Sequence, residues 1–238
     1  MSRNIVVNTF SRPVMHRDVE MCEHKGIGHP DTIHAAQKLN RQWIGIDITH
    51  LAVSLIEKRM KDAFPSIQFT VEGTPKDFEG ARNLAERDKY QFQWWACSLV
   101  NAQPYGGKKK GADSGIDGLI YFNDDGKMPK KIIVSVKGGE HVSRTMVADL
   151  KNAVEREKAQ LGLFVTLTEP TRPMKEEASS AGFYESPVGS NFPKIQILTI
   201  AGLLDGNEQA RYPDLARGGL TFKQAKVEEK SADQTKLF

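Results

Sequence analysis

One stretch of the chain has the pattern of a β-hairpin and constrains the fold more than any other feature. The apolar run Leu119 to Phe122 is followed by the turn sequence Asn123-Asp-Asp-Gly126 and then by the run Lys131 to Lys137. Asparagine and glycine favour a chain reversal between two strands. The pattern therefore predicts a hairpin. If it is centred between Gly126 and Lys127, Asp117 lies opposite Val136.

The second strand of this hairpin is expected to have two different faces. Side chains alternate along a strand, so Ile132, Val134 and Val136 share one face. Ser135 and Lys137 are then predicted to point together to the other face. Since adjacent strands lie roughly 4.8 Å apart, Asp117 and Lys137 can flank one metal ion and its water.

The rest of the second half alternates between helical and strand patterns. The expected helices share an amphipathic or polar pattern, and the expected strands are short apolar runs. In chain order they are helix 77–88, the apolar segment 90–100, the hairpin, helix 146–160, strand 161–167, a helix near 174–181 and strand 195–200. This order implies an α/β fold, a sheet covered by helices, over residues 76–206. The polar, lysine-rich residues 207–238 are predicted to be a disordered tail.

The first 75 residues divide into two predicted pieces. Residues 1–31 begin with a short β-like run at Ile5 to Val7 and end in a loop rich in glycine and proline. Residues 32–75 show the order helix, strand, helix, strand, with strands at Trp43 to Ile48 and Ile67 to Val71. The second piece therefore reads as a fragment of an α/β unit.

Composition excludes several classes of protein. The formal charge of +3 and the pI near 8.7 are mildly basic and fit DNA, RNA or no polyanion. Cys22 and Cys97 lie far apart without a CxxC motif, which indicates neither a disulfide framework nor a zinc site. There is no apolar run of about 18 residues and no signal-like N-terminus. We therefore expect a cytoplasmic protein without a membrane partner.

The residues around the hairpin suit phosphodiester hydrolysis. Such chemistry needs an anionic oxygen ligand for a hard cation and a cationic or basic group near the attacking water. Asp117 is expected to hold Mg²⁺, and Lys137 is expected to orient or activate the water. Shortly before them stands the run Lys108-Lys109-Lys110, which is either a solvated loop or a contact for the phosphate backbone.

These motifs resemble the PD-(D/E)xK superfamily, specifically its Mrr-like restriction domains, from about Tyr90 to Leu204. Gly115-Ile-Asp-Gly118 matches the family's aspartate turn, and Ser135-Val-Lys137 fills its (D/E/Q)xK tripeptide. Gln93 stands where the family usually has a helical glutamate. The resemblance implies a restriction-endonuclease-like mixed sheet flanked by helices. It also implies Asp117, Ser135 and Lys137 as catalytic residues, with Mg²⁺ on Asp117 and DNA as substrate.

Two departures from that family open an alternative function. Gln93 and Ser135 are neutral where the family has carboxylates, which weakens metal binding unless another acid supplies charge. Asp113, Glu140, Asp149 and Glu157 are the candidates for that acid. The chain is therefore either a magnesium-dependent DNA endonuclease of a restriction-modification system or a DNA-binding module that lost cleavage. A methyltransferase subunit and a second copy are the further expected partners.

Residues 32–47 resemble the helix and second strand that follow the cofactor loop of amino-group DNA methyltransferases. In that family the acidic residue at the strand end, here Asp47, binds the ribose of S-adenosylmethionine. The fold expectation thus includes a partial α/β methyltransferase-like segment. A remnant that binds S-adenosylmethionine is the third functional alternative. Asp47 is equally expected to cap the helix that begins near Thr49.

The first 31 residues carry a third resemblance. The sequence from Glu20 to Asp31 is similar to the opening of archaeal-type methionine adenosyltransferases, in which a Gly-His-Pro-Asp turn contacts triphosphate and magnesium. The resemblance implies such a role for His29 and Asp31. Because the other domains of that enzyme are missing, we expect a fused or truncated fragment rather than a synthetase.

Overall fold

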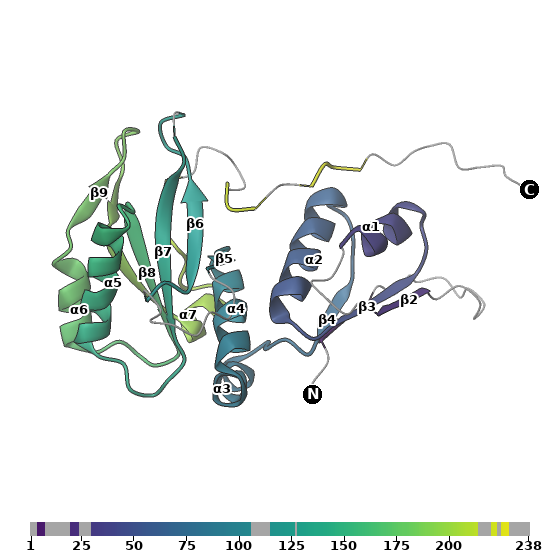
Figure 1. The fold of residues 1–238 in the computed structure, drawn as a ribbon, viewed down its shortest axis with the longest axis horizontal. Helices are drawn as coiled ribbons and strands as arrows, with labels where there is room; N and C mark the ends of the chain where they lie inside the picture. The colour runs from purple at the N-terminus through teal and green to yellow at the C-terminus, as the bar shows by residue number, and fades with distance from the viewer. Residues whose placement is uncertain are drawn as a thin grey trace, which may run out of the picture. The chain divides into compact units, whose positions relative to one another are not determined.

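The computed structural model describes seven stretches of the chain: residues 4–7, 20–23, 30–105, 115–126, 128–213, 220–222 and 225–228. The chain divides into two compact units (Figure 1). Unit 1 comprises Met1–Thr74 and Gln224–Phe238, and unit 2 comprises Pro75–Lys223. None of the helices in the described stretches has the length and apolar character needed to cross a membrane.

Unit 1 is a small four-stranded sheet with two helices. The strand order is β2 (Glu20–Glu23), β3 (Trp43–Asp47), β1 (Asn4–Val7) and β4 (Thr70–Glu72). β2 and β3 are parallel, whereas β1 is antiparallel to both β3 and β4. Helices α1 (Pro30–Lys38) and α2 (His50–Ala63) pack against the buried Trp43. Burial of these apolar side chains is the main stabilising term for a unit of this size.

The sheet of unit 1 differs from the sequence prediction in three ways. Residues 1–31 and 32–75 were expected to be separate pieces, yet β1 lies between β3 and β4 in one sheet. The strand β2 was not expected, because Glu20-Met-Cys-Glu23 has only two apolar residues between acids. The last strand begins at Thr70 rather than at Ile67, since the amide of Ile67 is hydrogen-bonded in a turn to Phe64.

Unit 2 is built on a five-stranded mixed sheet. Its strands, in spatial order, are β11 (Ile195–Thr199), β8 (Leu161–Thr166), β7 (Lys130–Lys137), β6 (Gly118–Phe122) and β5 (Gln103–Pro104). β7, β8 and β11 are parallel, and β5 and β6 join them by antiparallel pairing. A separate hairpin consists of β9 (Phe183–Glu185) and β10 (Asn191–Pro193). The mixed α/β fold expected for this region is present.

Helices cover both faces of this sheet (Figure 1). One face is covered by α3 (Phe78–Arg87), α4 (Lys89–Leu99) and α7 (Ile200–Leu204), and the other by α5 (Arg144–Arg156) and α6 (Arg172–Ser179). The central strand β7 shows the predicted alternation. Its residues Ile132, Val134 and Val136 lie in the core with α4, whereas Ile133 lies in the core with α5. All four are almost completely buried, so the register of β7 is strongly fixed.

The boundaries of several elements differ from the predictions. Helix α5 ends at Arg156, four residues before the expected end, and Lys158 shortly after it has the positive φ typical of a chain that leaves a helix. The short elements β5, β9, β10 and α7 were not predicted, because two to five residues give no clear period. Within the predicted tail, Leu220 donates a backbone hydrogen bond to Tyr121 and Glu228 donates one to Ala63, so these described residues make structural contacts.

Candidate functional site

The aspartate expected at the centre of the site lies just before β6. In the β6–β7 ladder Gly118 pairs with Val134, so Asp117 stands opposite Ser135, not opposite Val136 as predicted. The register differs by one residue because the hairpin is centred on Gly126, which has a positive φ of 72°. The Asn123 side chain stabilises this turn by accepting hydrogen bonds from the amides of residues 125 and 126. The strands and turn were predicted well, but the centre of the turn was not.

Four hydrogen-bond donors or cations surround the Asp117 carboxylate. Gln93 Nε2 donates to Oδ1 at 3.0 Å, and the Val136 amide donates to Oδ2 at 2.7 Å. The Ser135 hydroxyl makes a weaker contact with Oδ2 at 3.5 Å, and Lys137 Nζ lies 3.8 Å from the same oxygen. The structure therefore brings together Asp117, Ser135, Lys137 and Gln93, which the sequence had singled out separately.

Local sequence explains how these side chains converge. The backbone amide of Asp117 donates to the carbonyl of Val134, as in a regular β-ladder. The next amide on β7, that of Val136, donates to the Asp117 carboxylate instead of to a backbone carbonyl. The β6–β7 ladder therefore ends at this side chain. Gln93 comes from α4, whose Phe92 is buried against the sheet. A Cβ at Gly138, the residue after Lys137, would lie 2.7 Å from the Phe92 ring. Only glycine lets the chain leave β7 this close to α4.

A buried thiol lies behind the aspartate. Cys97 Sγ is 3.6 Å from the Asp117 carbonyl oxygen, to which it donates, and a Cβ at Gly118 would come within 2.8 Å of the same sulfur. Burial, and secondly the negative charge of Asp117, raise the pKa of the Cys97 thiol far above its ordinary value. The thiol is therefore an inert packing group. The sequence did not reveal this role, because the contact joins residues 20 positions apart.

Among the described residues, those around Asp117 do not fit a magnesium ion. Mg²⁺ prefers several oxygen ligands in near-octahedral geometry, and both oxygens of Asp117 already accept hydrogen bonds. Among the described residues no group of three or more His, Cys, Asp or Glu side chains is placed to hold a metal. Of the acids expected to substitute, Glu140 is 79% exposed and pairs with Arg82, and Glu157 pairs with Lys131 near the start of β7.

The remaining predicted residues are either outside the described stretches or in other elements. Lys108, Lys109, Lys110 and the candidate acid Asp113 lie outside the described residues, as does His29. Asp31 falls within α1.

Asp47 lies in unit 1, and its buried Oδ1 accepts from both the amide and the hydroxyl of Thr49 at 2.8 Å. Thr49 in turn caps α2 by accepting from the Ala52 amide. The N-cap of α2 is therefore Thr49 rather than Asp47, and Asp47 contributes by binding the amide and hydroxyl of Thr49.

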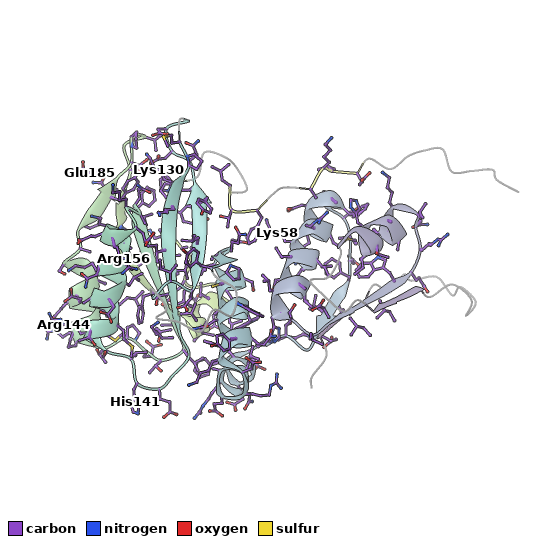
Figure 2. All side chains as sticks on the ribbon, viewed as in Figure 1. Lys58, Lys130, His141, Arg144, Arg156 and Glu185 are labelled. Carbon is purple, nitrogen blue, oxygen red and sulfur yellow. The ribbon has the colours of Figure 1, made fainter. Side chains whose placement is uncertain are left out.

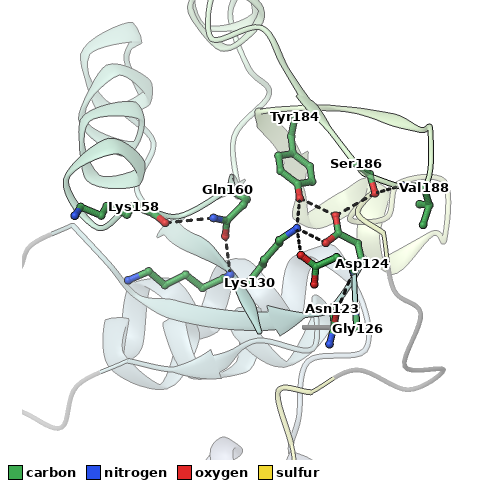
Figure 3. Close-up of polar contacts among 11 residues, drawn as sticks. Asn123, Asp124, Gly126, Lys130, Lys158, Gln160, Tyr184, Ser186 and Val188 are labelled. Carbon is green, nitrogen blue, oxygen red and sulfur yellow. Dashed lines mark hydrogen bonds and ion pairs between the residues drawn. The ribbon is translucent and has the colours of Figure 1, made fainter. Parts of the chain in front are cut away.

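A second cluster of a carboxylate and a lysine lies at the other end of β7. Asp124 Oδ1 accepts from Lys130 Nζ at 2.5 Å, and its Oδ2 accepts from the hydroxyls of Tyr184 at 2.7 Å and Ser186 at 3.0 Å (Figure 3). Lys130 also contacts Asp125 at 3.2 Å. Figure 2 shows Lys130 and Glu185 at one end of unit 2 and His141, which follows β7, at the opposite end. Asp124 thereby fastens the turn of the β6–β7 hairpin to the β9–β10 hairpin.

Burial and hydrogen bonding act in opposite directions on this second cluster. Burial alone would raise the pKa of the Asp124 carboxyl, but the hydrogen bonds from Lys130, Tyr184 and Ser186 outweigh it and lower that pKa. The hydrogen bond to Asp124 likewise raises the pKa of Lys130, against the effect of burial. Both residues are therefore charged over the ordinary pH range.

Comparison with known protein families gives a match within unit 2. The family described as NACHT-associated inactive Restriction Endonuclease 1 matches residues 98–205. Two similar solved structures are restriction endonuclease FokI, with a TM-score of 0.34, and FokI bound to DNA, with a TM-score of 0.35; both are 14% identical in sequence. Each alignment covers 67% of this chain and 30% of the FokI chain, so the chain spans less than a third of those proteins. No curated protein matches the chain. Residues 98–205 are thus similar to a restriction-endonuclease-like family.

Proposed function

We propose that unit 2 is a DNA-binding module that keeps the fold of a restriction endonuclease but does not cut DNA. The observation that carries this proposal is the surroundings of Asp117. The carboxylate accepts from the neutral Gln93 amide at 3.0 Å and lies next to the neutral Ser135 hydroxyl. At these two positions a metal-dependent site needs further oxygen ligands with negative charge. The name of the matching family, which describes an inactive restriction endonuclease, supports the same conclusion.

The remaining features of the site favour contact with a phosphate backbone. Lys137 lies at the end of β7 with 28% of its side chain exposed, and its 3.8 Å distance to Asp117 is longer than a normal ion-pair hydrogen bond. Its ammonium is therefore only loosely held. Lys108, Lys109 and Lys110 precede Asp117 by seven to nine positions and add three positive charges in the same part of the sequence. Lysine side chains that neutralise phosphates supply most of the sequence-independent affinity for DNA.

Binding of a labelled duplex to the full chain, measured by fluorescence anisotropy over a series of salt concentrations, tests the proposal. Each phosphate contact contributes about 0.9 to the slope of log affinity against log salt. We expect salt-dependent binding, and a slope about 2–3 smaller in the variant with alanine at residues 108, 109 and 110. Lys175→Ala, which removes an exposed lysine of α6, is the matched control and should leave the slope unchanged.

A cleavage assay on supercoiled plasmid, methylated and unmethylated, tests the second half of the proposal. With Mg²⁺, Mn²⁺ or EDTA we expect no nicking by the parent chain. Metal-dependent nicking that disappears in Lys137→Ala would overturn the proposal and establish an endonuclease. Absence of both DNA binding and cleavage would also overturn it.

A further inference from the structure

We infer that Asp117 acts as a fastening point between helix α4 and the β6–β7 hairpin, where an amide and an ammonium take the place that a cation would hold. This inference goes beyond the proposed function, because it concerns what holds the domain together whether or not it binds DNA. It predicts that the chain needs no metal for stability. It also predicts that a single substitution turns the same place into a cation site.

The contacts of Asp117 join three elements that are distant in sequence. Gln93 of α4 lies 24 positions before it, and the Val136 amide of β7 lies 19 positions after it. Asp117 itself leads directly into β6. The side chain of Asp117 is only 16% exposed, so its hydrogen bonds are largely shielded from water. Bonds to a shielded carboxylate are among the stronger ones in a protein, and an unpaired partner is costly.

The chemistry of the donors explains why no cation is required. A carboxylate at position 93 would face Asp117 at about the 3.0 Å distance that the Gln93 amide now occupies. Two ionised carboxylates at such a distance repel each other unless a proton or a cation lies between them. The amide of Gln93 removes that repulsion and donates a hydrogen bond. Lys137 supplies a positive charge on the opposite oxygen. The carboxylate is thus balanced by side chains of the chain itself.

The decisive variant is Gln93→Glu in the full chain, which exchanges a donor for a negative charge at nearly constant size. Gln103→Glu is the matched control, since it makes the same charge change at an exposed position in β5 of the same sheet. In EDTA, Gln93→Glu should lower Tm by roughly 4–8 °C and the control by less than about 2 °C. Mn²⁺ should restore most of the loss in Gln93→Glu and leave the parent and the control unchanged.

A second measurement does not depend on the folding of that variant. In Asp117→Asn an NH2 group replaces one of the two acceptor oxygens. The hydrogen bonds to the Val136 amide of β7 and to Gln93 of α4 should therefore weaken. Hydrogen exchange of peptides covering residues 89–99 and 130–137 should accelerate severalfold relative to the parent.

Two results would overturn the inference. One is a Gln93→Glu variant as stable in EDTA as the control, together with unchanged exchange in Asp117→Asn. The other is a parent chain that Mn²⁺ or Mg²⁺ stabilises by itself, because Asp117 would then hold a cation without any substitution. Neither result depends on DNA binding, which the anisotropy experiment measures separately.

Discussion

The two ends of strand β7 each carry a carboxylate, a lysine and a hydroxyl, yet they differ in almost every physical respect. At the Lys130 end the ion pair measures 2.5 Å, the Asp124 side chain is fully buried, and two hydroxyls complete its hydrogen bonds. At the Lys137 end the distance is 3.8 Å, and 16% and 28% of the two side chains are exposed. The same residue types thus form a tight, buried structural cluster around Asp124 at one end, here called the lock, and a looser, more accessible site around Asp117 and Lys137 at the other.

This difference shows why residue type alone does not identify a functional site. A buried pair with every oxygen bonded has no capacity left for a ligand, and removing one partner leaves an uncompensated charge. A partly exposed pair contributes little to stability and leaves its lysine able to exchange partners. We therefore assign a purely structural role to Lys130 and its partner Asp124, and ligand contact to Lys137 at the other end. Substitutions that remove either member of each pair test that assignment.

The largest effect is expected for Asp124→Ala. This substitution leaves Lys130 without its main counter-charge and removes the hydrogen-bond acceptor of the Tyr184 and Ser186 hydroxyls. The free energy of unfolding should fall by about 3–5 kcal/mol, as measured by denaturant titration of the full chain. Asp125→Ala, which removes the more exposed partner of the same lysine, is the control and should cost less than about 1 kcal/mol. Equal effects of the two variants would contradict the lock.

The pH dependence of stability should report the same carboxylate. Because the folded-state pKa of Asp124 lies below its ordinary 3.8, its contribution is present above that pH and is lost as pH falls through the lowered value. Lys130 has a raised pKa, so its contribution is present below pH 10.5 and is lost only as pH rises through the higher folded value. The stability difference between the parent and Asp124→Asn should therefore be constant from about pH 5 to about pH 9.

Denaturant titrations of both chains at several pH values would measure this difference. On the acid side it should shrink as the pH falls from 3.8 through the lowered folded-state pKa of Asp124. A difference that already disappears near neutral pH would mean that another group controls the lock.

A smaller effect on stability is expected for Gly118→Ala, at the residue that follows Asp117 and packs against Cys97. The added Cβ would lie 2.8 Å from Cys97 Sγ and 3.2 Å from the Cβ of Ala102. Overpacking of this kind costs about 1–3 kcal/mol, and Cys97→Ala in the same chain should recover part of the loss. Gly139→Ala is the control, since nothing lies within 4 Å of its Cβ position. Thermal unfolding of the three variants measures these effects. If Gly118→Ala were as stable as Gly139→Ala, the close approach of residue 118 to Cys97 would be contradicted.

The sequence was sufficient to predict that Asp117, Ser135 and Lys137 lie close together, but it did not predict the contacts of Asp124. Asp117, Ser135 and Lys137 lie close together because one hairpin with a recognisable turn connects them, and the alternation of β7 could be read directly from its residues. The approach of Gln93 depends on how α4 packs, and it was anticipated only from its place in a family motif. Asp124 looked like a turn residue, because its partners Tyr184 and Ser186 are 60 and 62 positions away. Tyr184 lies on β9, a strand too short to predict, and Ser186 directly follows that strand.

The smallest effect on stability, and the sharpest contrast with Lys130, is expected for Lys137→Ala. A partly exposed pair at 3.8 Å contributes less than about 1 kcal/mol, so Lys137→Ala should unfold at nearly the parent's denaturant concentration. Its effect should appear instead in DNA affinity, with a salt slope smaller by about 1. If Lys137→Ala were strongly destabilised while DNA binding persisted, both ends of β7 would be structural locks. The contact with DNA would then have to lie elsewhere on the chain.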